Sequence, residues 1–165
     1  MQHFGGTAEF TTWDGEPVSR EAPHGTTIVV GSRTADGWRY LLLHRGWRGP
    51  DWDGDWAWTP PSGSRKPGED VTACAMRELS EETGLTAEPV PVHTSGVGWA
   101  VFALEVPSDT DVTVDGTEHD RLAWVSYSQA CARCRPQALL DSFTAGAAAL
   151  RADTRESGGH GEGGA

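Results

Sequence analysis

The segment from Gly63 to Leu85 constrains this chain most, because it places three glutamates on one face of a predicted helix. Helix-forming residues run from Asp70 to Thr83. Within them, Glu78, Glu81 and Glu82 stand at positions i, i+3 and i+4, which project from the same side of an α-helix. Like charges at this spacing destabilise a helix by roughly 0.2–0.5 kcal/mol per pair. The cluster therefore needs an explanation, and a bound cation is one candidate.

Nearby glycines and an arginine help to decide whether these glutamates form a binding site or only a solvated acidic helix face. Gly63 and Gly68 lie in the loop that enters the helix, where the backbone must bend and can approach a ligand closely. Arg77 can orient one of the glutamates through a two-pronged contact. Hard divalent cations such as Mg²⁺ bind carboxylate oxygens, usually with substrate phosphates in the same shell. The segment therefore favours a divalent-metal site, whereas the glutamates alone would favour the solvated face.

The fixed residues of this segment follow the pattern Gly-x5-Glu-x7-Arg-Glu-Leu-x-Glu-Glu-x-Gly-Leu. The segment resembles the signature box of the Nudix hydrolase family at every fixed position, over 23 residues. Around the box the resemblance extends loosely from Thr26 to about Leu150. A chance match to so many fixed positions is rare. The matched positions are Gly63, Glu69, Arg77, Glu78, Leu79, Glu81, Glu82, Gly84 and Leu85.

The resemblance implies a role for each charged residue of the box. Glu78, Glu81 and Glu82 are expected to bind the metal, with Mg²⁺ as the natural ion and Mn²⁺ as a substitute. Arg77 is expected to orient a glutamate, and Glu69 to support the site from behind the metal ligands.

The loop before the helix departs from the family pattern at one position. The family often has glycine immediately before the box glycine, whereas this chain has Ser62, which follows two prolines. Every residue carries a backbone carbonyl, so Ser62 and Gly63 both stay candidates for the metal shell.

The resemblance also implies a general base in a later loop, a few residues before a strand that contains tryptophan. Glu118 stands six residues before Trp124, so it is the first candidate for the base or for a further metal ligand. Asp120 and the box residue Glu82 are the alternatives. His119 is expected at the surface or behind the site.

Arg45 and four tryptophans are candidates for contact with substrate or core. Arg45 ends a predicted strand, where family members often have an arginine that contacts phosphate; an exposed strand end is the equally good alternative. Trp47 and Trp52 can form a wall on which a nucleobase stacks. Trp56 and Trp58 are expected to pack in the core.

The predicted elements are mixed strands, a helix, further strands and a final helix, which places the chain in the α/β class, as layered α+β. The resemblance implies a Nudix-type α/β/α sandwich with a mixed β-sheet between helices. Residues 1–25 are expected to form an N-terminal extension, 26–152 the domain, and 153–165 a disordered glycine-rich tail. Strands are predicted at 26–30, 38–45, 56–59, 90–94, 98–106 and 121–126, and helices at 70–83 and 137–152.

The charge and cysteine content exclude some classes of protein. Acidic residues outnumber basic ones 24 to 13, which gives a net charge of −11 and argues against a partner that is a long nucleic acid or an anionic membrane. No apolar run is long enough for a transmembrane helix, and the first residues lack a signal-peptide pattern, so a cytoplasmic location is expected. The three cysteines are expected as free thiols, with Cys131 and Cys134 as structural residues of a short helix.

Together these features predict a Mg²⁺-dependent hydrolase that cleaves a phosphoanhydride bond in a nucleoside diphosphate linked to another group. Such a reaction needs neutralised phosphate charge and an oriented water. A module that senses a nucleotide without cleaving it, and an isomerase on the same fold, are the alternatives. Nucleoside triphosphates, nucleotide sugars, ADP-ribose and dinucleoside polyphosphates are all open as small-molecule substrates. Family members are often dimers, which keeps a homodimer open.

Overall fold

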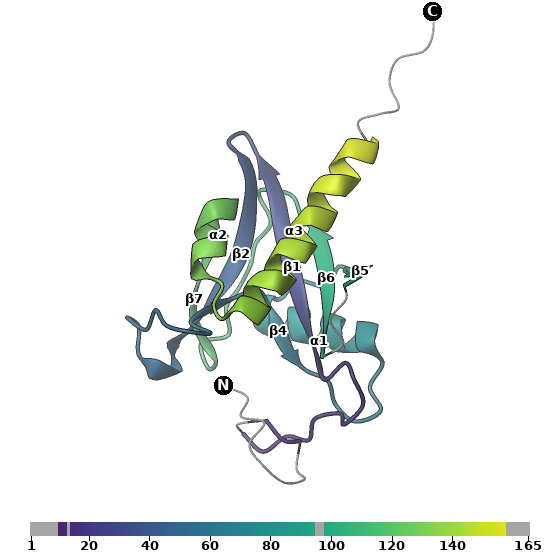
Figure 1. Ribbon diagram of the computed structural model, residues 1–165. Coiled ribbons are helices and arrows are strands. Elements are labelled where there is room, and N and C mark those ends of the chain that lie inside the picture. Colours follow the sequence, from purple (N-terminus) through teal and green to yellow (C-terminus); the bar gives the residue numbers. More distant parts are fainter. Residues whose placement is uncertain (1–9, 13, 95–97, 158–165) are drawn as a thin grey trace, which may run out of the picture.

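The computed structural model describes residues 10–12, 14–94 and 98–157 (Figure 1). The helices are α1 (Val71–Thr83), α2 (Tyr127–Arg133) and α3 (Gln137–Ser157), with a 3₁₀ turn η1 (Gly46–Arg48). The strands are β1 (Gly25–Thr34), β2 (Gly37–Arg45), β3 (Trp58–Thr59), β4 (Ser62–Ser64), β5 (Val90–Val92), β6 (Trp99–Glu105) and β7 (His119–Val125). They form one mixed sheet in the order β3-β2-β1-β6-β5, in which β4 also pairs with β1 and β7 with β2.

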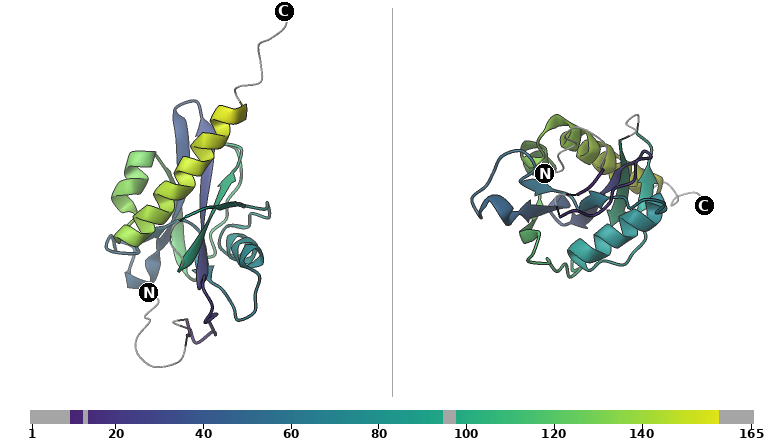
Figure 2. Two further views of the ribbon diagram at one scale, coloured as in Figure 1. Left: turned by 45° about the vertical axis from the view of Figure 1, so that its right-hand side comes forward. Right: turned by 90° about the horizontal axis from the view of Figure 1, so that it is seen from below.

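The sheet lies between helices on both of its faces (Figure 2). The central strand β1 shows why: Ile28 and Val30 join the core cluster on the α1 side, whereas Val29 joins the cluster on the side of α2 and α3. Side chains alternate across a strand, so this β-branched run is buried on both faces. The predicted α/β/α sandwich is confirmed.

Both ends of α1 carry the local signals that the sequence predicts. The Asp70 carboxylate accepts a hydrogen bond from the Ala73 backbone N–H at 3.0 Å, which satisfies a free donor of the first turn. Gly84 follows the helix with a φ of 75°, a left-handed conformation that glycine adopts without strain, and its N–H donates to the Ser80 carbonyl. The two caps fix where Glu78 and its neighbours stand along the helix.

Strand β4 lies in a stretch where the sequence predicted no strand. Serine and glycine have little intrinsic strand preference, so the signal is absent from the local sequence. The strand forms because it pairs antiparallel with β1, where Thr27 faces Ser62 and Thr26 faces Gly63. This pairing holds the loop that enters α1 against the middle of the sheet.

Two expectations about local structure are wrong. Helix α3 continues to Ser157, so residues 153–157, which the sequence assigned to the disordered tail, are helical; residues 158–165 lie outside the described residues. Trp56 is 39% exposed and has a φ of 65°, so it is not a core residue. Its neighbour Trp58 is buried in the core, as predicted.

The N-terminal extension is attached to the loop before α1 through the buried residue Arg65. The Arg65 guanidinium donates to the carbonyl oxygens of Pro23 at 2.7 Å and of Glu21 at 2.8 Å. It also donates to the carbonyl oxygen of Glu69 at 2.8 Å. In return, the Ser19 backbone N–H donates to the Arg65 carbonyl at 2.7 Å. The described part of the extension is therefore tied to the loop of the box.

The three cysteines are free thiols, as the sequence predicts. Cys74 lies inside α1, and burial raises the pKa of its thiol to about 11. Burial likewise raises the pKa of Cys134 to about 12. Thiols that stay protonated are poor nucleophiles and poor metal ligands, which supports a structural role for Cys74 and Cys134.

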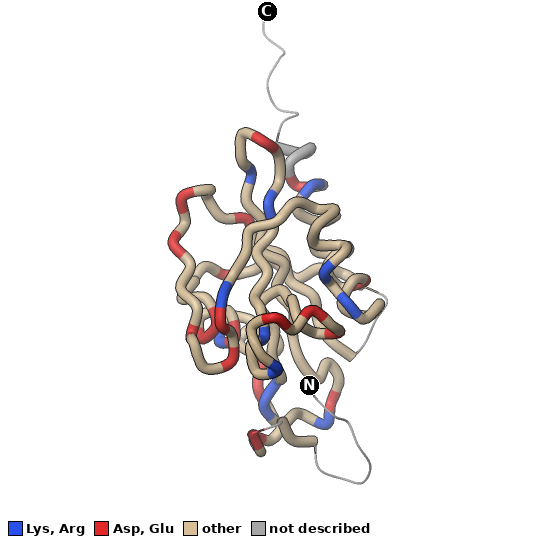
Figure 3. Tube along the Cα trace, turned by 90° about the vertical axis from the view of Figure 1, so that its left-hand side faces the viewer, with Lys and Arg blue, Asp and Glu red and all other residues tan. Residues whose placement is uncertain are grey.

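Charged residues are mixed over the face that carries η1, β7 and α2. Figure 3 shows acidic and basic positions interspersed along the trace, with no continuous basic stretch among the described residues in that view. Across the same described residues, no helix has the combination of length and apolar character needed to cross a membrane.

Candidate active site

The three box glutamates of α1 have different surroundings. Glu78 and Glu82 are buried, with 9% and 5% of their surface exposed. The Glu81 side chain is 57% exposed. The helix therefore turns two carboxylates toward the protein and leaves the third on the solvent side of the same cluster.

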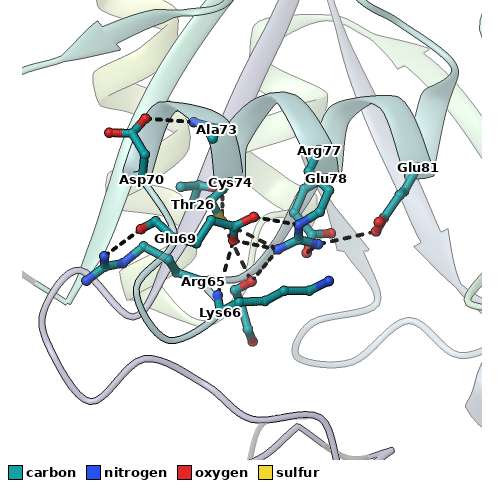
Figure 4. Close-up of polar contacts among 11 residues, drawn as sticks. Thr26, Arg65, Lys66, Glu69, Asp70, Ala73, Cys74, Arg77, Glu78 and Glu81 are labelled. Atoms are coloured by element: carbon teal, nitrogen blue, oxygen red, sulfur yellow. Dashed lines mark hydrogen bonds and ion pairs between the residues drawn. The ribbon is translucent and has the colours of Figure 1, made fainter.

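Arg77 lies at the centre of the charged contacts of the box (Figure 4). Its guanidinium contacts both carboxylate oxygens of Glu69, at 2.8 and 2.9 Å. It also donates to Glu78 at 2.8 Å and approaches Glu81 at 3.4 Å. The Ser64 carbonyl accepts a further hydrogen bond at 3.0 Å. The predicted orienting role thus has a geometric basis, and its two-pronged contact is made with Glu69.

The loop before α1 leaves room for a carboxylate only because glycine occupies position 63. A Cβ atom on Gly63 would lie 2.0 Å from the carboxyl carbon of Glu78. One residue earlier, the Ser62 backbone N–H donates to a carboxylate oxygen of Glu82 at 2.9 Å. Both buried glutamates therefore meet the β4 segment at its backbone. Gly68, farther along the loop, has a φ of 73°, as expected of a bend that needs glycine.

The start of β7 brings a second group of polar residues to the buried glutamates. One potential ligand atom from each of Glu82, Glu118 and His119 lies within 4.8 Å of the others. Arg45 is the register partner of His119 across the β2–β7 pair, next to a shift in that register. Next to the larger effect of burial, its positive charge influences the pKa of both Glu82 and His119, so it acts on the same cluster. Residues far apart in the sequence thus meet around Glu82.

Burial dominates the electrostatics of this cluster. It raises the pKa of Glu78 to about 7, although the Arg77 guanidinium opposes the change. Burial, together with the nearby carboxylates of Glu78 and Glu118, raises the pKa of Glu82 well above its usual range. Burial lowers the pKa of His119 to about 4, and the Arg45 charge acts in the same direction. Carboxylates that resist ionisation in this way are stabilised by a divalent cation, which supplies the missing positive charge.

Several buried polar atoms of the cluster fit such an ion. The Glu82 Oε1 atom and both ring nitrogens of His119 are buried and have no hydrogen-bond partner among the described residues. The Arg45 Nε atom is likewise buried without a partner among the described residues, but as a cationic donor it suits an anion and not the metal. Buried polar atoms are normally paired, so unpaired ones in one place indicate a missing ligand. The donor set of carboxylate oxygens and an imidazole suits a divalent metal.

Asp120 takes part in a different network. Its carboxylate contacts His44 Nδ1 at 2.7 Å and accepts from Arg121 at 3.1 Å. The other ring nitrogen of His44, Nε2, donates to the Trp52 carbonyl at 2.7 Å. Arg121 in turn donates to the Pro50 carbonyl at 2.9 Å. Asp120 thus anchors the loop that carries Trp52, and Glu118 is the acidic residue of this segment that faces the buried glutamates.

The tryptophans proposed as a substrate wall lie beside this anchored loop. The Arg48 guanidinium stands over the rings of both Trp47 and Trp52, at 4.7 and 4.5 Å from their centroids. Trp47 is exposed, and Trp52 lines a recess of about 440 Å³ with Trp58, Arg121, Arg133 and other residues. The residues that line this recess come from the loop after η1, from β3 and β7, and from the end of α2 with the segment that follows it. Both tryptophan rings thus share the Arg48 guanidinium as a neighbour.

The sequence leaves two places open for His119, at the surface or behind the metal ligands, and the structure excludes the surface. His119 is 1% exposed, so it is not a surface residue. The sequence around His119 is polar on both sides, with Glu118 before it and Asp120 after it, so it gives no sign of burial. The register shift at Arg45 decides which way β7 turns these side chains. The backbone contact between Ser62 and Glu82 was equally invisible in the sequence.

Comparison with known proteins places the chain in a family. The NUDIX domain family model matches residues 23–145. A protein of Myxococcus xanthus named octanoyltransferase is 34% identical over 146 residues, which are 80% of this chain and 39% of that protein. A bis(5'-nucleosyl)-tetraphosphatase (asymmetrical) of Sus scrofa is 31% identical over 86 residues, 45% of this chain and 58% of that protein. The matched part of this chain thus spans about two fifths of the length of the Myxococcus xanthus protein and about three fifths of the length of the Sus scrofa protein.

A solved structure of similar fold gives an independent comparison. An Ap4A hydrolase of C. elegans, in a binary complex, has a TM-score of 0.60 and 21% sequence identity to this chain. The alignment covers 78% of this chain and 97% of that one. The sandwich, the box on α1 and the matching family model agree, and the chain belongs to the Nudix hydrolase family.

Proposed function

We propose that this protein is a divalent-metal-dependent hydrolase that cleaves a phosphoanhydride bond in a nucleoside diphosphate linked to another group. One observation carries the proposal: carboxylate oxygens of Glu82 and Glu118 lie within 4.8 Å of each other, where Glu82 Oε1 lacks a partner among the described residues, and Glu78 is near enough to raise the pKa of Glu82. Acidic groups so close to one another in a largely buried place repel unless a cation joins them.

The metal ligands of this proposal come from α1, from β4 and from the residue just before β7. Glu78, Glu82 and Glu118 would hold the ions from the protein side, and Glu81 from the solvent side. The backbone carbonyls of Ser62 and Gly63 complete the candidate set. A bound Mg²⁺ or Mn²⁺ supplies charge neutralisation of the phosphates and acidifies a coordinated water.

Glu118 is our candidate for the general base. It lies close enough to Glu78 and Glu82 to raise their pKa values, yet it comes from a loop outside the helix. A carboxylate at such a position can accept a proton from a water that the cluster orients. Asp120 is less suited, because His44 and Arg121 already hold its carboxylate.

Substrate contacts are proposed at Arg45 and at the tryptophan loop. The Arg45 Nε atom is buried without a partner among the described residues and lies in the same cluster as Glu82 and His119. A guanidinium there suits a phosphate oxygen of the substrate. Trp47 and Trp52 offer aromatic faces for the remainder of the molecule, and Trp52 also lines the recess.

The choice of substrate is tested first with dinucleoside polyphosphates, because the Sus scrofa relative is a bis(5'-nucleosyl)-tetraphosphatase. ADP-ribose, nucleotide sugars and nucleoside triphosphates complete the panel. Each compound is incubated with Mg²⁺ or Mn²⁺, and the products are identified by mass spectrometry in ¹⁸O-labelled water. The labelled product identifies the phosphorus atom that the water attacks.

Matched variants separate a catalytic site from a folded binding module. Glu82→Gln removes one carboxylate from the cluster and is expected to abolish turnover, whereas Glu88→Gln makes the same chemical change at an exposed position. A sensing module would bind a nucleotide from the panel and release no product with either metal. An isomerase would convert its substrate without incorporating ¹⁸O. Either result would overturn the proposal.

A further inference from the structure

His119 is a buried histidine whose ring nitrogens have no partner in the described part of the chain. It opens β7, only 1% of its surface is exposed, and neither of its ring nitrogens has a hydrogen-bond partner among the described residues. Leaving a buried polar group unpaired lowers the stability of a fold. A side chain that serves packing alone would be better replaced by an apolar one.

His44 shows what a satisfied buried histidine looks like in the same protein. It is also fully buried, yet Nδ1 contacts Asp120 at 2.7 Å and Nε2 contacts the Trp52 carbonyl at 2.7 Å. Its ring also packs against that of Trp58, 4.9 Å away between centroids. Of the two histidines, His119 is therefore the one whose nitrogens are available to a ligand.

The ring of His119 lies beside two carboxylates. One ligand atom of His119 lies within 4.8 Å of an oxygen of Glu82 and of an oxygen of Glu118, which also lie that close to each other. Atoms that bind one zinc-sized ion at about 2.1 Å are at most about 4.2 Å apart. Small rotations of these side chains therefore bring all three onto a common ion.

We propose that His119 supplies a nitrogen ligand, with Glu82 and Glu118, to one divalent ion, so that this position favours a transition metal of the Mn²⁺, Co²⁺ or Zn²⁺ kind over Mg²⁺. Imidazole nitrogen binds these ions well, whereas Mg²⁺ prefers oxygen ligands and gives up its water reluctantly. The inference rests on the metal site of the proposed function and adds a ligand that the acidic residues of the box do not provide.

Mn²⁺ electron spin echo spectroscopy tests the inference directly on the full, tag-free protein. A nitrogen ligand couples the ¹⁴N nucleus to the bound Mn²⁺ and modulates the echo. We expect this modulation in the wild type and in His93→Gln, an exposed histidine that serves as the control. We expect its loss in His119→Gln. A wild type that binds Mn²⁺ with no ¹⁴N modulation overturns the inference, whether or not the variant folds.

Calorimetric titration with Co²⁺ and with Mg²⁺ provides the second measurement. His119→Gln is expected to weaken Co²⁺ binding at least about tenfold and Mg²⁺ binding by less than about threefold, because only the nitrogen ligand is lost. Circular dichroism establishes that the variant is folded, and His119→Asn replaces it if it is not. Equal loss of both metals in a folded variant contradicts the inference.

The two proposals fail in different ways. If the wild type hydrolyses a substrate with Mg²⁺ but gives no ¹⁴N modulation, His119 is not a ligand and the proposed function stands. If the wild type binds neither Mg²⁺ nor Mn²⁺, the metal-dependent function fails as well.

Discussion

The backbone of Gly63 lies directly against the carboxylate of Glu78, so closely that a Cβ atom at position 63 would lie 2.0 Å from the carboxyl carbon. This contact joins β4 to α1 and explains why the loop before the helix needs glycine at this point. The carboxylate is held by Arg77 on its other side. Its position is therefore set by two elements that are separate in the sequence.

Gly63→Ala should displace Glu78 while leaving the fold intact. We expect activity to fall by about a hundredfold, because a misplacement of about 1 Å in a catalytic group has that effect. The control is Gly116→Ala, since a Cβ atom on Gly116 meets nothing within 4 Å. Steady-state kinetics and thermal unfolding of both variants check this. Unchanged kinetics in folded Gly63→Ala would contradict the account of the contact.

Arg77→Lys should destabilise the fold as well as the site. Lysine cannot contact both oxygens of Glu69 and reach Glu78 with the same group. We expect the free energy of unfolding in urea to fall by about 1–3 kcal/mol. The control is Arg33→Lys, because the Arg33–Glu105 pair is exposed and should contribute less than about 1 kcal/mol. Similar losses in the two variants would show that Arg77 is an ordinary surface residue.

Glu69 should make the protein lose stability in acid. The Arg77 guanidinium lowers the pKa of Glu69 from 4.5 to about 2, so the unfolded chain takes up this proton before the folded chain does. The ionised Glu69 carboxylate therefore adds to the free energy of unfolding. This addition is fully present above pH 4.5 and disappears as the pH falls toward 2. Its size is on the order of 3 kcal/mol. Urea unfolding of the wild type and Glu69→Gln between these pH values should show a steeper acid loss in the wild type.

Metal binding should strengthen as the pH rises through neutrality. Burial raises the pKa of Glu78 to about 7, and this carboxyl must lose its proton before it can bind a cation. Titration with Mn²⁺ should therefore give tighter binding at pH 8 than at pH 6. Glu78→Gln should bind more weakly and with less dependence on pH, whereas Glu88→Gln should behave as the wild type. An affinity independent of pH in the wild type would contradict the role of Glu78.

Removing the charge of Glu118 should lower activity, whereas removing the charge of Asp120 should lower stability. Glu118→Gln should lower kcat by roughly 10²–10⁴-fold, as expected for a general base, with little change in unfolding temperature. Asp120→Asn should instead lower stability, because it weakens the contacts with His44 and Arg121. Measuring kcat and thermal unfolding for both variants separates the roles. The reverse pattern would make Asp120 the better candidate for the base.

The parts of the fold that the sequence predicts are those with local signals. α1 is bounded by a capping aspartate, Asp70, and by Gly84, and both act within one turn of the helix. β4 and the last turns of α3 lack such signals. The residues of β4 become a strand because β1 pairs with them, and polar residues 153–157 continue a helix that is already nucleated.

The part of the candidate site that lies on α1 can be predicted from the sequence, whereas the part that β4 and β7 contribute cannot. The spacing of Glu78, Glu81 and Glu82 follows from helix geometry, so their shared face could be predicted. Their unequal burial depends on where β4 lies. The burial of His119 depends on the register of β7 against β2, which shifts at Arg45 and cannot be derived from local preference.

The contacts of Arg65 bear on how short this protein can be made. The NUDIX domain match begins at residue 23, but the guanidinium of Arg65 is bonded to the carbonyl of Glu21 as well as to that of Pro23. A chain trimmed to begin at residue 24 would strip two acceptors from a cation that has almost no access to water. Residues 19–23 thus support the segment that carries Gly63, and their removal would disturb that segment through Arg65 although none of them belongs to the box.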